Sequence, residues 1–188
     1  MYLYMLKLGA TPKGRLIEQH DIFFGIANQV HELIPHFEQS WAEIKDIWHI
    51  DAYRKVCQVD GHTIEIVPKD SVIDNDKKLY FINLGGYKPN HFEEYHHKML
   101  VVAKDMAEAT SIAKRSAFYQ EFDIVGTRAT SHIDNKYGVD VDEIFDVMDA
   151  LPAYFKQRYQ IKITATTDTA PDEMVIGYLP KKLFINPN

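Results

Sequence analysis

The sequence predicts an α+β fold built from two tandem β-β-α-β-β repeats that pack together as a pseudo-twofold unit. Three observations favour this class: an internal similarity at a spacing of 76 residues, short aromatic and apolar runs typical of strands, and one amphipathic stretch of helical spacing in each half. With 188 residues, 46% of them hydrophobic, the chain has the length and composition of a globular protein with one large domain or two small ones.

The internal similarity relates residues 3–27 to residues 79–103. Seven of these 25 ungapped positions are identical, where composition alone would give about one or two. The similarity resumes at a larger offset, so that His49-Ile50-Asp51 matches His132-Ile133-Asp134. A repeat of this size has one sheet face to bury, so we expect each copy to cover the other. We therefore predict repeat one at residues 1–70, a charged linker at 71–78, repeat two at 79–166 and a C-terminal extension at 167–188.

The elements of repeat one follow from its hydrophobic pattern. Residues 2–8 and 20–27 are apolar and aromatic runs too short for helices, and we predict strands. A helix follows, in which Pro35 is expected either to kink the helix or to mark its start. The apolar stripe of this helix consists of Val30, Leu33, Ile34, Phe37 and Trp41. Asp60-Gly61 is a strong signal for a tight hairpin between two further strands, at residues 48–59 and 62–67.

Repeat two carries the same elements with one insertion. Its second strand, at residues 97–103, leads into a helix whose start has a capping box formed by Asp105 and Glu108. Apolar residues at helical spacing then predict an extra helix, a helical insertion near 142–157. The last strand, at residues 159–164, alternates isoleucines with polar residues, as expected for a sheet with one buried face.

Composition and charge exclude several classes of function. A formal net charge of -6 without a basic stripe argues against nucleic acid as a partner. No apolar run approaches the roughly 20 residues that a membrane span needs, so we expect no membrane partner. The first residues lack a secretion signal, and the single cysteine, Cys57, cannot form an internal disulfide, so we expect a cytoplasmic protein. We also expect a homodimer formed through a sheet edge or a helix face.

A signature in repeat two is similar to a known family. The run from Leu79 to Tyr87, followed by Phe92, Glu94 and His96, resembles a small bacterial family known only as domain-of-unknown-function family 1543. The His49-Ile50-Asp51 and Val59-Asp60-Gly61 stretches also resemble it. Members carry one or two copies of the domain, so the resemblance implies two tandem copies in a bacterial protein. It implies no activity and no catalytic residue.

Two polar patterns occur in both halves and are the best candidates for a functional site. Each half contains Glu-x-His and His-x-Asp, in which residues two apart on a strand point to the same side. If neighbouring strands carry these pairs, imidazole and carboxylate groups converge, and this donor set suits zinc, manganese or non-haem iron. The eight residues are Glu18, His20, His49 and Asp51 in repeat one, and Glu94, His96, His132 and Asp134 in repeat two.

Two other interpretations of these residues stay open. A carboxylate paired with an imidazole can pin the long loop after the first strand to the sheet, and such a device would also recur in both halves. Alternatively, a histidine oriented by its acid can carry protons as a general acid–base pair. The sequence requires no cofactor, and a divalent metal is one hypothesis among three.

The sequence favours a non-enzymatic binding or assembly module as the function. The alternative is a metal-dependent or acid–base enzyme that acts on a small substrate through the repeated Glu-x-His and His-x-Asp residues. A third hypothesis is a sensor that binds a small-molecule ligand between the halves. An enzyme needs these residues inside a concave pocket, whereas a module needs an exposed apolar patch.

Three glycines mark the ends of the first strands. Gly9, Gly85 and Gly86 each follow an apolar run. No third glycine and no Gly-Lys-Ser/Thr follows Gly86, so a phosphate-binding loop is disfavoured. We therefore predict backbone turns with positive φ at these positions.

Overall fold

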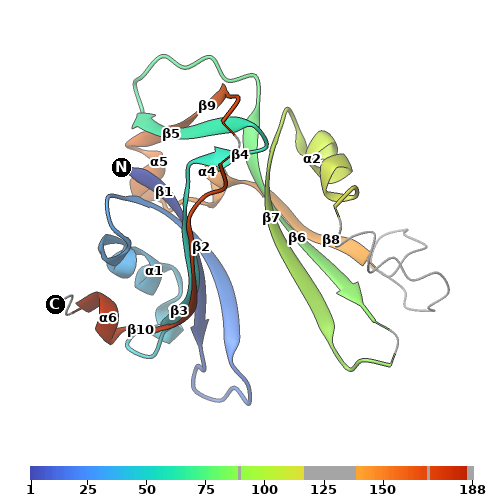
Figure 1. Cartoon of the computed structure of the whole chain (residues 1–188). Helices are drawn as coiled ribbons and strands as arrows, with labels where there is room; N and C mark the ends of the chain where they lie inside the picture. Colours follow the sequence, from blue (N-terminus) through green and yellow to red (C-terminus); the bar gives the residue numbers. More distant parts are fainter. Residues whose placement is uncertain (89, 117–138, 169, 186–188) are drawn as a thin grey trace. The chain divides into compact units, whose positions relative to one another are not determined.

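The computed structural model of the chain describes residues 1–88, 90–116, 139–168 and 170–185, without the side chains of residues 139 and 140. The fold is mixed, with mostly antiparallel sheets and few, short helices (Figure 1). The chain divides into two compact units, which are Met1–Asp74 with Ala150–Asn188 (unit 1) and Asn75–Asp149 (unit 2). His132 and Asp134 lie outside the described residues. No helix in the described parts combines the length and the apolar character needed to cross a membrane.

Unit 1 is built on a four-stranded antiparallel sheet in the order β10-β3-β1-β2. The first three strands in the chain lie where the sequence predicts strands, since aromatic and β-branched runs suit a pleated surface. The fourth strand belongs to the C-terminal extension and covers the edge that β3 would otherwise leave unpaired. The strands are β1 (Tyr2–Ala10), β2 (Gln19–Ala27), β3 (His49–Val56) and β10 (Met174–Pro180).

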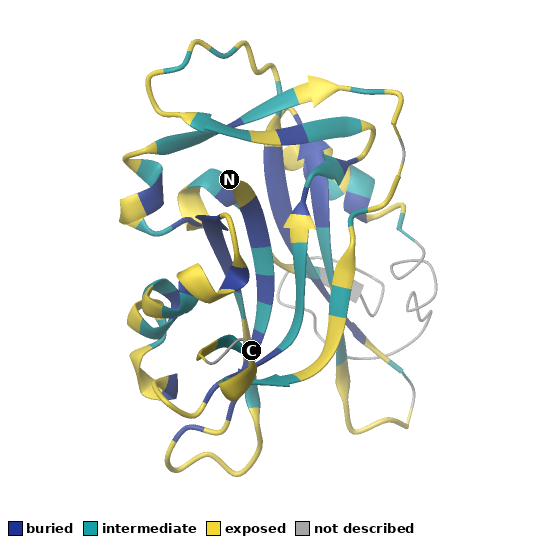
Figure 2. Cartoon of the chain, turned by 60° about the vertical axis from the view of Figure 1, so that its left-hand side comes forward, coloured by how far each residue is buried: buried dark blue, intermediate teal, exposed yellow. Residues whose placement is uncertain are grey.

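A short helical segment connects β2 to β3. It consists of η1 (Val30–Leu33), α1 (Ile34–Ser40) and η2 (Ala42–Ile44). Pro35 lies in the first turn of α1, where its missing N–H is not needed, so it marks the start of the helix and not a kink. Phe37 is completely buried and makes edge-to-face contacts with the rings of Phe23 and Trp48. Figure 2 shows the buried residues concentrated along the strands and the exposed residues in the connecting loops.

A second sheet of unit 1 has three strands in the order β4-β5-β9. The predicted hairpin at Asp60-Gly61 is confirmed, because Val59 pairs with His62 and both turn residues have positive φ. The last strand of the predicted repeat two pairs along its whole length with the last strand of repeat one, so both halves of the sequence contribute to this sheet. The strands are β4 (Gln58–Val59), β5 (His62–Pro68) and β9 (Tyr159–Ala165).

The described part of unit 2 contains a three-stranded antiparallel sheet in the order β7-β6-β8, against which the helix α2 packs. The predicted capping box is confirmed, because the Asp105 carboxylate accepts a hydrogen bond from the backbone N–H of Glu108. Ala109 and Ala113 are fully buried and pack α2 into a core that β6 and β7 complete. The elements are β6 (Lys78–Tyr87), β7 (Glu94–Ala103), α2 (Met106–Ala113) and β8 (Val139–Asp146).

The predicted helical insertion near 142–157 is wrong in its first part. Residues up to Asp146 form β8, and only then do two short helices follow, α4 (Val147–Ala150) and α5 (Ala153–Lys156). The apolar spacing of this segment fits an irregular strand as well as a helix. Pairing decides between the two, because β8 pairs along β6 and stacks Phe145 on Phe81.

The predicted backbone turns at Gly9, Gly85 and Gly86 are also wrong. All three glycines lie inside strands β1 and β6, and none of them has a positive φ. A Cβ on Gly9 would come within 2.4 Å of His49 Nε2, and a Cβ on Gly85 within 2.4 Å of Asp142 Oδ2. These two positions need glycine because a side chain of the neighbouring strand lies against the backbone.

Candidate metal centre

Four of the eight predicted site residues come together in unit 1. His20 on β2 and His49 on β3 are both backbone partners of Gly9 on the central strand β1. The two histidines therefore flank the same glycine, and the absence of a Cβ there leaves room for the His49 ring. Glu18 lies one residue before β2, at the end of the loop that follows β1.

A β-bulge brings the fourth residue, Asp51, into this group. The register between β1 and β3 shifts after Lys7, and Asp51 is left as an extra residue without a partner on β1. Such a bulge redirects a side chain and is common beside functional sites. Here it places Asp51 near His20 on β2, while His49 reaches Glu18 at the end of the preceding loop.

The four side chains form a closed ring in which imidazole nitrogens alternate with carboxylates. His20 Nε2 lies 3.1 Å from Glu18 Oε2 and 3.0 Å from Asp51 Oδ2. His49 Nε2 lies 3.2 Å from Glu18 Oε1 and 3.1 Å from Asp51 Oδ1. Each nitrogen therefore faces both acids, and each acid offers one oxygen to each histidine.

The inner part of this cluster is buried. The His49 side chain is 5% exposed and that of Asp51 22%, whereas those of His20 and Glu18 are 36% and 41% exposed. His49 Nε2 and Asp51 Oδ2 are shielded from solvent and have no hydrogen-bond partner among the described residues. Both atoms nevertheless lie within 3.2 Å of a group of the opposite kind, and an ion bound between the groups would contact both atoms.

Two further residues border the cluster, and sequence reasoning missed both. Lys7 on β1 places its Nζ 3.6 Å from Asp51 Oδ2. Tyr178 on β10 packs against His49 with ring centroids 4.3 Å apart and the ring planes tilted by 33°. Lys7 has a usable signal, because it lies two residues before Gly9 and so on the same strand face. No sequence pattern points to Tyr178, because nothing local in the C-terminal extension indicates that β10 pairs with β3.

Unit 2 brings together a second group of the same residue types. His96 Nε2 lies 3.7 Å from Glu94 Oε2 and 3.3 Å from Asp142 Oδ2. One donor atom from each of the three residues lies within 4.8 Å of the other two. Asp142 is the extra residue of a β-bulge on β8, just as Asp51 is on β3. This cluster is more exposed than that of unit 1, since no member is buried.

Asp142 is not among the residues that the sequence predicts, because it falls in the segment predicted as a helix. Sequence similarity instead favours Asp134 as the counterpart of Asp51, and Asp134 lies outside the described residues. The signal that points to Asp142 is the run Asp140-Val141-Asp142, which repeats the polar-apolar-Asp pattern of His49-Ile50-Asp51. Because β8 pairs with β6, the structural counterpart of Asp51 is Asp142.

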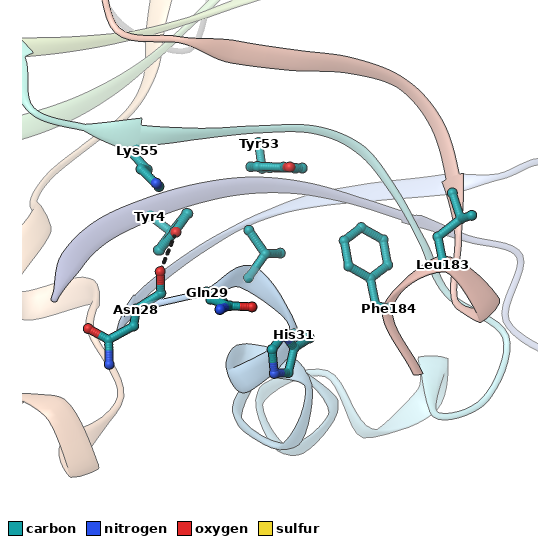
Figure 3. Close-up of a pocket in the computed structure, with 9 residues that line it drawn as sticks. Tyr4, Asn28, Gln29, His31, Tyr53, Lys55, Leu183 and Phe184 are labelled. Atoms are coloured by element: carbon teal, nitrogen blue, oxygen red, sulfur yellow. Dashed lines mark hydrogen bonds between the residues drawn. The ribbon is translucent and has the colours of Figure 1, made fainter. Parts of the chain in front are cut away.

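A separate cavity of about 280 Å³ lies elsewhere in unit 1 and contains none of the cluster residues (Figure 3). Its walls come from β1, β3, the start of η1 and the C-terminal helix α6 (Lys182–Ile185). The Tyr4 hydroxyl donates a hydrogen bond of 3.0 Å to the backbone carbonyl of Asn28. Burial, with a smaller contribution from the neighbouring Tyr53, raises the pKa of Tyr4 to about 12.

The raised pKa of Tyr4 predicts a loss of stability at alkaline pH. The folded state disfavours the phenolate, so the stabilisation is complete below the ordinary pKa of 10.0 and is lost as the pH rises through about 12. We expect the free energy of unfolding to fall less over this range in Tyr4→Phe than in the wild type. Urea denaturation at several pH values, with tyrosinate absorbance to follow ionisation, measures both effects. Parallel pH curves for the two proteins would contradict this assignment.

The fold and the cluster define an antiparallel α+β protein with a mixed imidazole and carboxylate group in its N-terminal sheet. A family model described as Domain of Unknown Function (DUF1543) matches residues 15–66, a range that includes all four residues of the unit 1 cluster. This match supports the family that the sequence resembles.

One solved structure is similar over almost the whole chain. It is described as the crystal structure of a protein Il1583 from Idiomarina loihiensis, with 21% sequence identity and a TM-score of 0.63. The alignment covers 95% of this chain and 97% of that chain. At this identity the similarity shows the fold alone. No curated protein matches the chain, and these comparisons assign no function.

Proposed function

We propose that the protein is a metal-binding module in which Glu18, His20, His49 and Asp51 bind one divalent transition-metal ion, with zinc as the best match. The observation that carries this proposal is the buried Nε2 atom of His49. It lies within 3.2 Å of two carboxylates and yet makes no hydrogen bond to any described residue. A metal ion is an occupant that binds such a nitrogen and both acids at once.

The spacing of the donor atoms supports a tetrahedral ion. Zinc binds imidazole nitrogen and carboxylate oxygen at about 2.0–2.2 Å, which places neighbouring ligand atoms about 3.3 Å apart. The nitrogen–oxygen separations in the cluster run from 3.0 to 3.2 Å. These four separations are close to that spacing.

The charges and the surroundings also support the proposal. Two carboxylates balance the charge of a divalent ion, and the imidazoles bind it in their neutral form. Groups around metal ligands hold them in place and tune their affinity. Tyr178, packed against His49, and Lys7, beside Asp51, are suitably placed for this role.

A closed set of four protein ligands favours a binding role over catalysis. Catalytic zinc sites keep one position for water or substrate, whereas structural sites fill all four with protein atoms. Glu18 ends the loop between β1 and β2, so an ion bound to it would also fix this loop to β3. The proposal therefore joins two of the hypotheses from the sequence, the loop brace and the metal site, in one non-enzymatic module.

The proposal includes a tandem duplication as the origin of the two clusters. Each unit has a central strand between its two neighbours in the same order, β2 and β3 around β1, and β7 and β8 around β6. The register shift lies between Lys7 and Leu8 in unit 1 and between Asn83 and Leu84 in unit 2, which are 76 residues apart. This is the spacing of the internal similarity in the sequence, and it supports one ancestral β-β-α-β unit.

The test is zinc binding by the full chain after treatment with a chelator. Isothermal titration is expected to show a high-affinity zinc site that His49→Ala weakens by more than ~100-fold, because loss of a mere supporting partner already weakens binding 10–100-fold. His31→Ala is the matched control, since His31 is in unit 1 but lines the separate cavity. This control should bind zinc as the wild type does.

Thermal unfolding gives a second readout of the same proposal. Zinc at a hundredfold excess over its Kd should stabilise the wild type by about 2.7 kcal/mol. For a chain of this length, this corresponds to an increase in Tm of about 5–11 °C. Zinc should not raise the Tm of His49→Ala in this way. If the wild type binds no zinc, or if His49→Ala binds it equally well, the histidines act as ion-paired braces and the proposal is wrong.

A further inference from the structure

We infer that unit 2 holds a second cation site, formed by Glu94, His96 and Asp142, which favours ions of the manganese type that prefer oxygen ligands. The inference rests on the proposed function, because it extends metal binding from unit 1 to the equivalent position of unit 2. It adds that the two positions prefer different metal ions, which follows from the donor atoms and the solvent exposure of unit 2.

Units 1 and 2 share two backbone features at this position, a glycine on the central strand and a bulge on a neighbouring strand. Gly85 pairs with His96, as Gly9 pairs with His20. A bulge on β8 redirects Asp142, and its carboxylate lies against Gly85, where a Cβ would come within 2.4 Å. The bulge and the glycine together fix the position of this carboxylate, because the bulge directs the side chain and the glycine leaves room for it.

The donor set differs in kind between the two units. Unit 1 offers two imidazoles and two carboxylates, whereas the described cluster of unit 2 offers one imidazole and two carboxylates. The backbone partner of Gly85 at the register position of His49 is Asp140, so unit 2 lacks the second histidine there. Imidazole suits zinc, whereas carboxylate oxygen suits manganese and magnesium. A described donor set with one imidazole therefore favours zinc less than a set with two.

The lysine near the acids is placed differently in the two units. Lys7 lies beside Asp51 in unit 1, whereas the equivalent residue of unit 2 is Asn83, whose amide lies 3.5 Å from Asp142 Oδ2. Lys98, the register partner of Asn83, stands where unit 1 has Ile22 as the partner of Lys7, so unit 2 has its lysine on the neighbouring strand.

Solvent access supports an ion that keeps part of its water shell. The side chains of His96 and Glu94 are 36% and 38% exposed, whereas that of His49 is 5% exposed. Ions that prefer oxygen are bound through one or two carboxylates and retain several waters. The Tyr87 hydroxyl donates a hydrogen bond to Glu94, which helps to hold this carboxylate in position.

The test uses the full chain loaded with one equivalent of zinc and then titrated with Mn²⁺, with electron paramagnetic resonance to detect the free ion. The wild type is expected to bind one Mn²⁺. Asp142→Asn should weaken this binding at least about tenfold, because it removes an anionic ligand. Glu143→Gln is the matched control, since it removes the same charge from the next residue, whose carboxylate accepts a hydrogen bond from Asn83. This control should bind Mn²⁺ within about twofold of the wild type.

Titration of His49→Ala with Mn²⁺ in the absence of zinc separates this inference from the proposed function, because zinc that unit 1 no longer binds would otherwise compete for unit 2. Mn²⁺ binding is expected to persist in that variant, because the site lies in unit 2. If the wild type takes up no Mn²⁺, or if Asp142→Asn and Glu143→Gln behave alike, the inference is overturned, whatever zinc does in unit 1. If Mn²⁺ binding is lost in His49→Ala, the ion occupies unit 1 and the inference is again overturned. Absence of zinc binding in unit 1 would instead refute the proposed function.

Discussion

Substitution of Gly9 by alanine is expected to abolish high-affinity zinc binding although it changes none of the four ligand residues. The new Cβ would lie 2.4 Å from His49 Nε2 and 2.8 Å from its Cε1, distances that no carbon atom tolerates. The imidazole is the end of a side chain and must rotate away, which removes one of four ligands. We expect a loss of more than ~100-fold in zinc affinity, since loss of a supporting group alone weakens binding 10–100-fold. Isothermal titration measures it.

Gly25→Ala provides the control for this prediction. Gly25 lies on β2 of the same unit, and a Cβ there would meet Leu33 at 2.6 Å and Phe23 at 2.8 Å. This variant should lose stability, by about 1–3 kcal/mol for an overpacked core, but should keep its zinc affinity. Zinc binding by Gly9→Ala with wild-type affinity would show that His49 is not a ligand.

Truncation of Phe37 to alanine is expected to cause a large loss of stability in unit 1. Phe37 has no exposed surface, and its ring contacts Phe23 at a centroid distance of 5.9 Å and Trp48 at 4.8 Å. Large-to-small changes at buried phenylalanines cost about 3–5 kcal/mol. Both tryptophans of the chain, Trp41 and Trp48, lie in unit 1, so their fluorescence during urea denaturation reports this unit alone.

Val72→Ala is the corresponding control, because Val72 is fully exposed in the same unit. Truncation there should change the free energy of unfolding by less than about 0.5 kcal/mol. Equal denaturation midpoints for Phe37→Ala and Val72→Ala would contradict the buried aromatic core described for this unit.

Local signals in the sequence predict the elements that depend on neighbouring residues. The Asp60-Gly61 turn forms because both residues accept positive φ, and the α2 helix begins at Asp105 because its carboxylate caps the N–H of Glu108. These features involve residues at most a few positions apart. The strands of both central hairpins are predictable for the same reason, since short aromatic and apolar runs indicate strands without knowledge of their partners.

Elements that depend on distant partners escape prediction. β8 has apolar spacing compatible with a helix, and only its pairing with β6, about 60 positions earlier in the chain, makes it a strand. β10 is apolar but largely exposed, and it becomes a strand because it closes the edge of β3. The need for glycine in β1 and β6 was unpredictable for the same reason, since the side chains that require these glycines come from other strands.

The sequence by itself determined which residue types recur, the Glu-x-His pairs and the His-x-Asp pair, because covalent spacing along one strand decides which side chains share a face. Only the tertiary structure decided which of them meet. It brought Asp51 to His20 through a bulge, placed Tyr178 on His49, and gave unit 2 Asp142 as the acid beside His96. The physical reason is that strand register is set by hydrogen bonds between segments far apart in the chain, and a shift of one residue reverses the face that a side chain takes.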